Sequence, residues 1–196
     1  MTAMDTILVV NAGSSSVKFQ VFAVDGDGRL SRQMKGQIDG IGSRPRLRAT
    51  GVSGNPLVDR AYTLENVGDV SAALTVAGDW LRDELGVTPL AVGHRVVHGG
   101  PDYDRPVFVD HAVVTRLERM ASLAPLHQPY NLSPMRSLLH NLPKLPQVAC
   151  FDTGFHRGHD AVADHYAIPR HPHVEASGVT AFMACPTNSL PRRCQG

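Results

Sequence analysis

Short segments with strand-like patterns of hydrophobic and polar residues dominate the N-terminal third of the chain. The apolar run Ile7–Val10 ends at Asn11 and a Gly-Ser turn, which is typical of a buried strand. Ser16–Val24 alternates imperfectly between apolar and polar residues and predicts a second strand. The polar stretch Arg29–Thr50 is expected to form hairpin strands whose arginines lie on solvated faces, and Gly51–Pro56 is expected to be a turn.

A helical period replaces this pattern further along the chain. Apolar residues recur every three or four positions over Val70–Leu85, and Gly86 is placed to end the helix. Either Asp69 or Ser71 could cap its start.

Two more helices are expected between two further apolar strands, Pro89–Val97 and Gln147–Phe151. Asp110 is the expected cap of the first helix and Asn131 that of the second. Their apolar positions are Val113, Val114, Leu117 and Met120 in the first, and Leu132, Met135, Leu138 and Leu139 in the second. Strands followed by alternating helices and strands predict an α/β domain with a mixed sheet.

Composition narrows the class of protein. The 196 residues are 42% hydrophobic and 19% charged, which fits a globular chain of one domain or slightly more. Because the net charge is only +1, we do not expect nucleic acid or an anionic membrane surface to be the main partner. We expect no membrane span and no secretory signal, because no apolar run is long enough and Met1–Val10 lacks a basic segment.

The cysteines and histidines argue against a structural metal site. Three cysteines (Cys150, Cys185 and Cys194) lack metal or redox spacing, and this low, odd number fits a reducing cytoplasm. The later histidines show no compact ligand pattern, so no zinc site is expected; they are His159, His165, His171 and His173.

Polar residues with possible chemistry fall where the expected strands end. Asn11, Arg95, His98 and Asp152 occupy such positions, and open α/β sheets bind ligands at the carboxyl ends of their strands. Arg95 could hold a carboxylate or phosphate through two parallel hydrogen bonds, or form a structural ion pair. Asp152 could serve a metal ion or orient a nucleophile, or cap a turn.

The turn between the first two strands is a candidate phosphate site. Its small residues allow a phosphate to approach the backbone, and its serines and Lys18 add polar partners. An ordinary hairpin with a polar turn is the alternative. No helix is expected to follow, so the nucleotide P-loop pattern is absent.

Four stretches together resemble the acetate kinase family of acyl-phosphate-forming kinases: Val10–Phe19 (VNAGSSSVKF), Val92–Gly100 (VGHRVVHGG), Leu123–His127 (LAPLH) and Phe151–His156 (FDTGFH). The resemblance implies the actin-like, ribonuclease-H-like fold, with a mixed β-sheet flanked by helices. It covers the first of the family's two domains, incomplete here, over residues 1–178.

The resemblance also implies roles for individual residues. Asn11 matches a residue that helps to hold magnesium. Ser14, Ser16 and Lys18 match phosphate-facing residues of the first turn, with Lys18 reaching the transferred phosphate.

The remaining matched residues serve the acetate side. Arg95 matches the arginine that binds the substrate carboxylate and the phosphoryl charge, and His127 matches a histidine near the phosphoryl group. Val97 and Leu126 match apolar walls for a small methyl group. Asp152 matches the aspartate that serves the metal and the carboxylate nucleophile.

The implied activity is acetate kinase: reversible, Mg²⁺-dependent phosphoryl transfer from ATP to acetate in the cytoplasm. A carboxylate nucleophile needs alignment and charge neutralisation rather than a strong base. A propionate kinase and a catalytically inactive fragment are the alternatives. The intact family member is expected to be a homodimer, with acetate and ATP as its small-molecule partners.

The resemblance ends near Gly178, and residues 179–196 read as an aberrant, disordered tail. Codons can be written for the segment from Thr180 to Gly196 so that a shifted frame encodes YGFHGLSYEFIAEAMPG, which the family would have next. We therefore expect a frameshift just before Thr180, as a mutation or a sequencing error, and little kinase activity from the 196-residue product.

Overall fold

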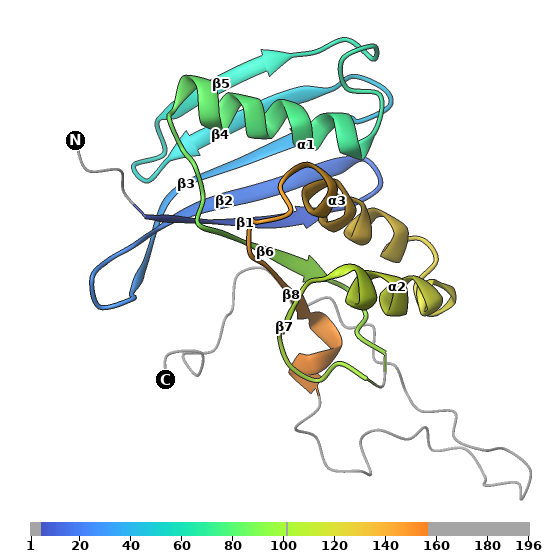
Figure 1. Cartoon of the computed structure of the whole chain (residues 1–196). Coiled ribbons are helices and arrows are strands. Elements are labelled where there is room, and N and C mark those ends of the chain that lie inside the picture. Colours follow the sequence, from blue (N-terminus) through green and yellow to red (C-terminus); the bar gives the residue numbers. More distant parts are fainter. Residues whose placement is uncertain (1–4, 101, 157–196) are drawn as a thin grey trace, which may run out of the picture.

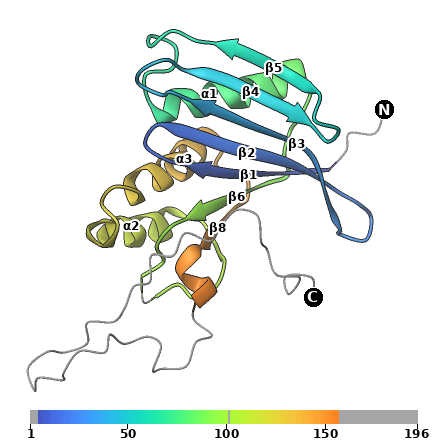
Figure 2. The same cartoon turned by 180° about the vertical axis from the view of Figure 1, so that it is seen from behind.

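The computed structural model describes residues 5–100 and 102–156. The expected tail, Cys185, Cys194 and the histidines after His156 lie outside the described residues. Within them, one eight-stranded sheet has the order β5-β4-β3-β2-β1-β6-β8-β7. The three α-helices cover one face of this sheet, as the two opposite views show (Figures 1 and 2).

The first five strands form an antiparallel meander. They are β1 (Thr6–Ala12), β2 (Ser16–Val24), β3 (Leu30–Asp39), β4 (Arg46–Gly51) and β5 (Pro56–Ala61). The two N-terminal strands and the hairpin strands within the polar stretch are therefore confirmed. Strand β5 was not anticipated, because it lies at the sheet edge with no fully buried residue and so lacks a hydrophobic signature.

The other half of the sheet is mostly parallel. Strand β6 (Ala91–Val96) pairs in parallel with β1, and β8 (Gln147–Phe151) pairs in parallel with β6. The two-residue strand β7 (Val107–Phe108) closes the sheet by antiparallel pairing with β8. The predicted mixed sheet is confirmed, and the carboxyl ends of β1, β6 and β8 meet at one edge.

The first predicted helix forms with one difference in its last turn. Helix α1 (Val70–Asp79) begins at Asp69, whose carboxylate accepts a hydrogen bond from Ala72 N at 2.8 Å. It continues as a π-helical turn, η1 (Trp80–Glu84). The chain then leaves at Gly86, whose φ of 65° is a conformation that glycine adopts without steric cost.

Helix α2 (His111–Arg119) is capped by Asp110 as predicted, through a 2.7 Å hydrogen bond from Val113 N. A short 3₁₀ turn, η2 (Ala121–Leu123), leads toward α3 (Gln128–Asn141), and a second one, η3 (Asp152–His156), follows β8.

The predicted capping role of Asn131 was wrong. Helix α3 starts three residues before Asn131, with a proline in its first turn, where the missing N–H is not needed. Asn131 lies one turn into the helix and is buried.

The core fills the space between the sheet and the helices. Apolar residues of β1 to β4 pack under α1, and a second cluster lies between β6, β8 and the helices α2 and α3. Phe19 lies directly over Gly36 of the next strand, where a Cβ atom would be 2.3 Å from the Phe19 ring. No helix in the described part of the chain is long and apolar enough to cross a membrane.

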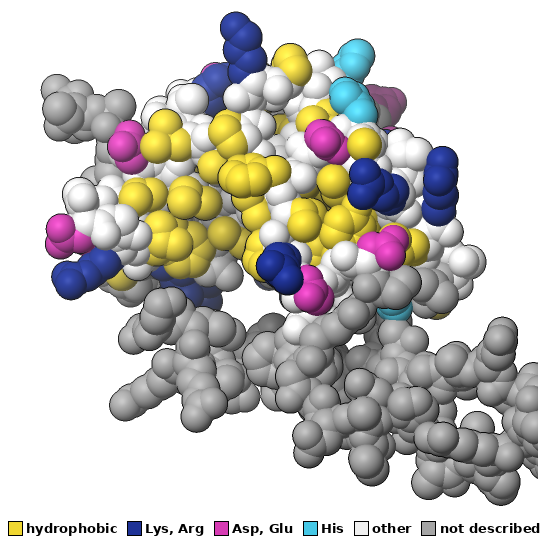
Figure 3. Space-filling model, turned by 60° about the horizontal axis from the view of Figure 1, so that its bottom comes forward, with side chains coloured by type: hydrophobic (Ala, Val, Ile, Leu, Met, Phe, Trp, Pro, Cys, Tyr) yellow, Lys and Arg dark blue, Asp and Glu magenta, His cyan; other side chains and the backbone are white. Residues whose placement is uncertain are grey.

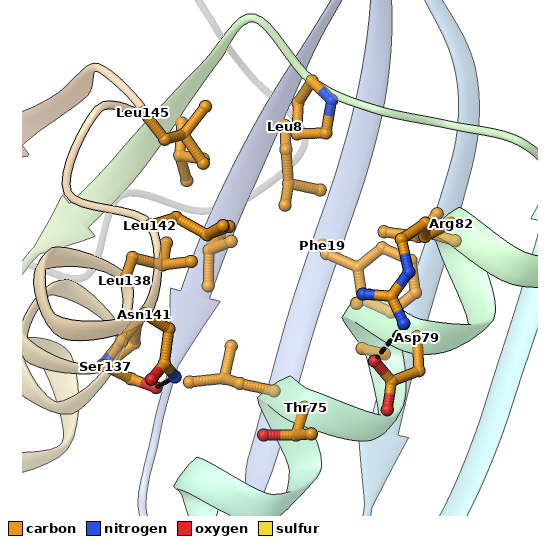
Figure 4. A pocket seen from close by; sticks show the side chains of 18 of the residues that line it. Leu8, Phe19, Thr75, Asp79, Arg82, Ser137, Leu138, Asn141, Leu142 and Leu145 are labelled. Carbon is orange, nitrogen blue, oxygen red and sulfur yellow. Dashed lines mark hydrogen bonds and ion pairs between the residues drawn. The ribbon is translucent and has the colours of Figure 1, made fainter.

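A groove of about 730 Å³ lies between α1 and α3 on the helix-covered face. Leu8 and Phe19 form its floor, Leu138 and Leu142 one wall, and Thr75 lies on the α1 side (Figure 4). Hydrophobic side chains gather in several areas of the face that Figure 3 shows, with charged side chains around and between them. The groove is mostly apolar and lies on the opposite sheet face from the polar strand-end residues.

Candidate active site

Arg95 is the centre of the polar cluster at the strand ends. It alternates along β6 with buried residues, so its side chain projects from the face that the α-helices leave uncovered. Its Nε donates to Asp152 Oδ1 at 3.0 Å and its Nη2 donates to Oδ2 at 2.6 Å. The two side chains are 41% and 31% exposed, so a ligand can reach this two-point ion pair.

The sheet register explains why these residues meet. Arg95 pairs with Cys150 in the parallel β6–β8 ladder, and Asp152 follows β8 at the start of η3. On the other side, Arg95 Nη1 donates to Asn11 Oδ1 at 3.3 Å. The Arg95 guanidinium therefore connects three separate stretches of the sequence, because it binds both Asn11 and Asp152.

Lys18 adds a positive charge beside this group. It is the direct cross-strand partner of Asn11 in the β1–β2 ladder, and its exposed side chain leaves the same face of the sheet. A shallow cavity of about 440 Å³ continues from Asn11 and Lys18 across β3 and β4, where Lys35 and Arg48 also line it. Arg48 is paired with Asp39 at 2.7 Å, so the two lysines supply excess positive charge for an anionic ligand.

The first turn is tight and leads directly into a strand. Gly13 N donates to Ser16 O at 2.8 Å, and β2 begins at Ser16. The strand–turn–strand prediction is confirmed, together with the absence of a P-loop helix. Ser14 is exposed in this turn and Ser16 is half-buried.

The residues matched to the acetate side are not all gathered around Arg95. Val97 is half-buried immediately after β6, but Leu126 is 76% exposed. His127 is exposed at the start of α3. Within the described residues, the apolar wall expected from Val97 and Leu126 is therefore open.

Two side chains shape the loops around the site: Thr153, which sequence reasoning missed, and His98, which it placed at the end of a strand. Thr153 Oγ1 accepts a hydrogen bond from Gly99 N at 3.0 Å, which joins η3 to the turn after β6. His98 is buried, and its Nδ1 accepts a hydrogen bond from Gly100 N at 2.7 Å. The small polar residues in the sequence of these turns are typical of such side-chain to backbone hydrogen bonds. The pattern of hydrophobic residues does not predict them.

Asn131, first expected to be a cap, contacts both strands that carry the cluster. Its carboxamide donates to Ala12 O and accepts from Val97 N. The apolar pattern does not distinguish this role from capping, because in both cases the asparagine directly precedes the apolar positions that begin at Leu132.

The donor atoms near Arg95 suit magnesium better than zinc. Asn11 Oδ1 and the Asp152 carboxylate are hard oxygen donors, and Mg²⁺ is commonly bound by one or two carboxylates together with waters and substrate phosphates. In the described part of the chain, no three His, Cys, Asp or Glu side chains form a metal-binding group. These oxygens could therefore hold a magnesium ion that a phosphate ligand helps to bind.

A buried pair, His94 and Gln147, lies on the other face of the same strands. His94 is 2% exposed, and its Nε2 lies 2.9 Å from Gln147 Oε1. Burial lowers the pKa of His94 from 6.5 to about 4, and the hydrogen bond to Gln147 opposes that shift only in part. His94 is therefore a neutral part of the core.

Comparison with known proteins places this geometry in a family. The model of the acetokinase family matches residues 6–183. The chain belongs to the acetokinase family. Its relatives include the acetate kinase of Nitrobacter hamburgensis (strain DSM 10229 / NCIMB 13809 / X14), at 73% identity over 172 residues, and that of Rhizobium meliloti, at 56% over 167 residues.

Solved structures agree with the assignment. The acetate kinase of Porphyromonas gingivalis aligns with a TM-score of 0.73 and a propionate kinase of Francisella tularensis subsp. tularensis SCHU S4 with 0.71, each at 29% identity and over 85% of this chain. The actin-like fold expected for this family member is therefore confirmed. The chain spans 43% and 42% of the lengths of the two curated relatives, which it matches over 88% and 85% of its own length.

Proposed function

We propose that the chain carries the acetate-side half of an acetate kinase site, for reversible phosphoryl transfer between ATP and acetate. The observation that carries the proposal is the Arg95 guanidinium, shared between Asp152 and Asn11 at the carboxyl ends of neighbouring strands. A member of the acetokinase family with this geometry has a cation where an acyl phosphate would develop charge.

Each side chain then has a task that its position supports. Arg95 binds the carboxylate of acetate and neutralises the oxygens of the transferring phosphoryl group, because a guanidinium fork fits such groups with paired hydrogen bonds. Lys18 supplies a second cation from the neighbouring strand. Ser14 and Ser16 border the turn in which backbone N–H groups would face phosphate.

Asp152 and Asn11 would hold the magnesium ion through their oxygens. When bound, Mg²⁺ neutralises phosphate charge during the transfer. In its absence, Asp152 holds the Arg95 guanidinium through two hydrogen bonds and so preorganises it at the strand ends. His127 would lie beside the phosphoryl group.

Substrate choice rests on the apolar residues. Val97 and Leu126 would receive the methyl group of acetate, but the exposure of Leu126 leaves room for one more carbon. Propionate is thus the second candidate substrate, favoured by this open wall and by the likeness to a propionate kinase. A single methylene changes discrimination by only about 1–3 kcal/mol.

The direct test is the formation of acyl phosphate, trapped as the hydroxamate with hydroxylamine. Purified chain, ATP and Mg²⁺ are supplied with acetate or propionate. Magnesium-dependent acetyl hydroxamate that disappears in Arg95→Ala and persists in Arg82→Ala supports the proposal. Arg82 is a matched control because it is an exposed, ion-paired arginine of η1 beside the distant groove.

The alternative is that this chain binds substrate without turnover. The matched relatives are more than twice its length, so further catalytic groups of an intact enzyme could lie in the unmatched part. Absence of hydroxamate together with Arg95-dependent binding of acetyl phosphate would favour this inactive form. A homodimer and a cytoplasmic location are proposed for the intact enzyme.

A further inference from the structure

Asn131 lies where two strands of the sheet separate. Strands β1 and β6 pair in parallel up to Val10 and His94, the last pair in their register. Beyond that pair, β1 runs into the first turn and β6 into the loop after Val96. Helix α3 passes beside both strands at this point and presents Asn131, which is 4% exposed.

The Asn131 side chain joins the two strand ends. Its Nδ2 donates to Ala12 O at 2.6 Å, and its Oδ1 accepts from Val97 N at 3.0 Å. A carboxamide has the same donor and acceptor as a peptide group, held in one plane. The Asn131 side chain therefore bridges β1 and the residue after β6 by two hydrogen bonds, beyond the last pair of the β1–β6 ladder.

The joined atoms lie next to the polar cluster. Ala12 follows Asn11 directly, and Val97 is two residues after Arg95. The 3.3 Å contact between Arg95 Nη1 and Asn11 Oδ1 spans the same gap that Asn131 bridges. Any change in the separation of the strand ends would move these two side chains relative to each other.

We propose that Asn131 is a positioning residue, which sets the spacing of Asn11 and Arg95 by tying the ends of β1 and β6 to α3. Asn131 is 4% exposed and is not among the residues proposed to bind substrate or metal. Its catalytic relevance rests on the proposed function, whereas its structural action does not. The same tie fixes Val97, so Asn131 also places one wall of the proposed methyl site.

The unsubstituted chain provides the first test. Val97 N–H lies beyond the end of β6, yet the hydrogen bond to a buried acceptor should protect it from exchange with solvent. We expect its exchange rate to lie within about tenfold of the rates of the β6 amides. Exchange as fast as that of an exposed loop amide would overturn the proposal.

Two variants separate the two hydrogen bonds. Asn131→Asp retains the acceptor for Val97 N but, when ionised, cannot donate to Ala12 O, whereas Asn131→Ala removes both contacts. Val97 exchange should accelerate at least about tenfold in the alanine variant and remain slow in the aspartate variant. Asn141→Ala is the matched control, because Asn141 is an exposed asparagine at the other end of the same helix.

The Arg95 Nε–H resonance reports the effect on the cluster. This proton is donated to Asp152, so its ¹H and ¹⁵N chemical shifts depend on the placement of Arg95. We expect a shifted or broadened signal in both Asn131 variants and an unchanged signal in Asn141→Ala. An unchanged Arg95 signal in folded Asn131→Ala would refute the positioning role.

Neither measurement needs turnover. If acetyl phosphate is never formed but the exchange and Arg95 results hold, the proposed function fails and the positioning role stands. If the chain is active, the fall in hydroxamate formation should be larger in Asn131→Ala than in Asn141→Ala.

Discussion

Buried His94 should make the stability of this domain fall in mildly acidic solution. The imidazole is enclosed between the sheet and the helices, and its folded pKa of about 4 lies below the ordinary 6.5. As the pH falls, His94 therefore binds a proton near pH 6.5 in the unfolded chain, but only near pH 4 in the folded chain. The contribution of His94 to the free energy of unfolding is fully present above about pH 6.5 and is lost as the pH falls from there to about 4.

The size of the effect follows from the two pKa values. Between pH 7 and pH 5, protonation of this one histidine in the unfolded state costs about 2 kcal/mol of unfolding free energy. That is a large part of the ~5–15 kcal/mol that typically stabilises a domain. The loss should level off once the pH reaches the folded pKa of about 4.

Urea unfolding at pH 7 and pH 5 provides the assay. In His94→Gln the group that titrates is gone while a polar partner for Gln147 remains, so the difference between the two pH values should shrink by about 2 kcal/mol. His140→Gln, at the exposed end of α3, is the matched control and should leave the His94 contribution in place. An equal pH dependence in the chain and in His94→Gln would refute the reasoning.

Three further predictions concern the fold and the gene. Gly36→Ala would press a methyl group into the Phe19 ring, so urea unfolding should show a loss of about 1–3 kcal/mol, whereas Gly26→Ala, with open space at its Cβ position, should cost far less. Asp69→Ala removes the cap of α1 and should cost about 1 kcal/mol in the same assay; an unchanged midpoint would contradict the capping role. Sequencing the gene across the codon for Val179 should reveal the YGFHG string in another frame; an intact frame without such a string would exclude the proposed frameshift.

The parts of the fold found from sequence are those with a strong local signal. The apolar runs of β1 and β8 and the helix caps at Asp69 and Asp110 behave as their residue types predict. Strand β5 carries no hydrophobic pattern, because its residues pair at an exposed edge. The pairing partner, rather than its own sequence, makes this segment a strand.

The sequence predicted which residues form the polar cluster around Arg95, but not how their side chains contact one another. The positions of Asn11, Arg95 and Asp152 after apolar strands suggested a shared edge, and the parallel register brings them together. The pattern could not distinguish a capping Asn131 from a buried one. That distinction depends on how α3 packs against β1 and β6, a contact between residues more than thirty positions apart in sequence.

The exposure of Leu126 also lay beyond the reach of sequence reasoning. A residue type can match an apolar wall, but its burial depends on what packs against it. In the described part of the chain nothing closes over this leucine, so the role of Leu126 stays a prediction from resemblance.

The central claim is that Arg95 makes the strand ends a site for an acyl phosphate. Calorimetric titration of the purified chain with acetyl phosphate and Mg²⁺ tests it most directly, with Arg95→Ala and Arg82→Ala beside it. We predict saturable binding that weakens at least about tenfold in Arg95→Ala, since hydrogen bonds to charged groups contribute about 1.5–3 kcal/mol, and that persists in Arg82→Ala. Equal binding by the chain and by Arg95→Ala, or no binding by the folded chain, would contradict it.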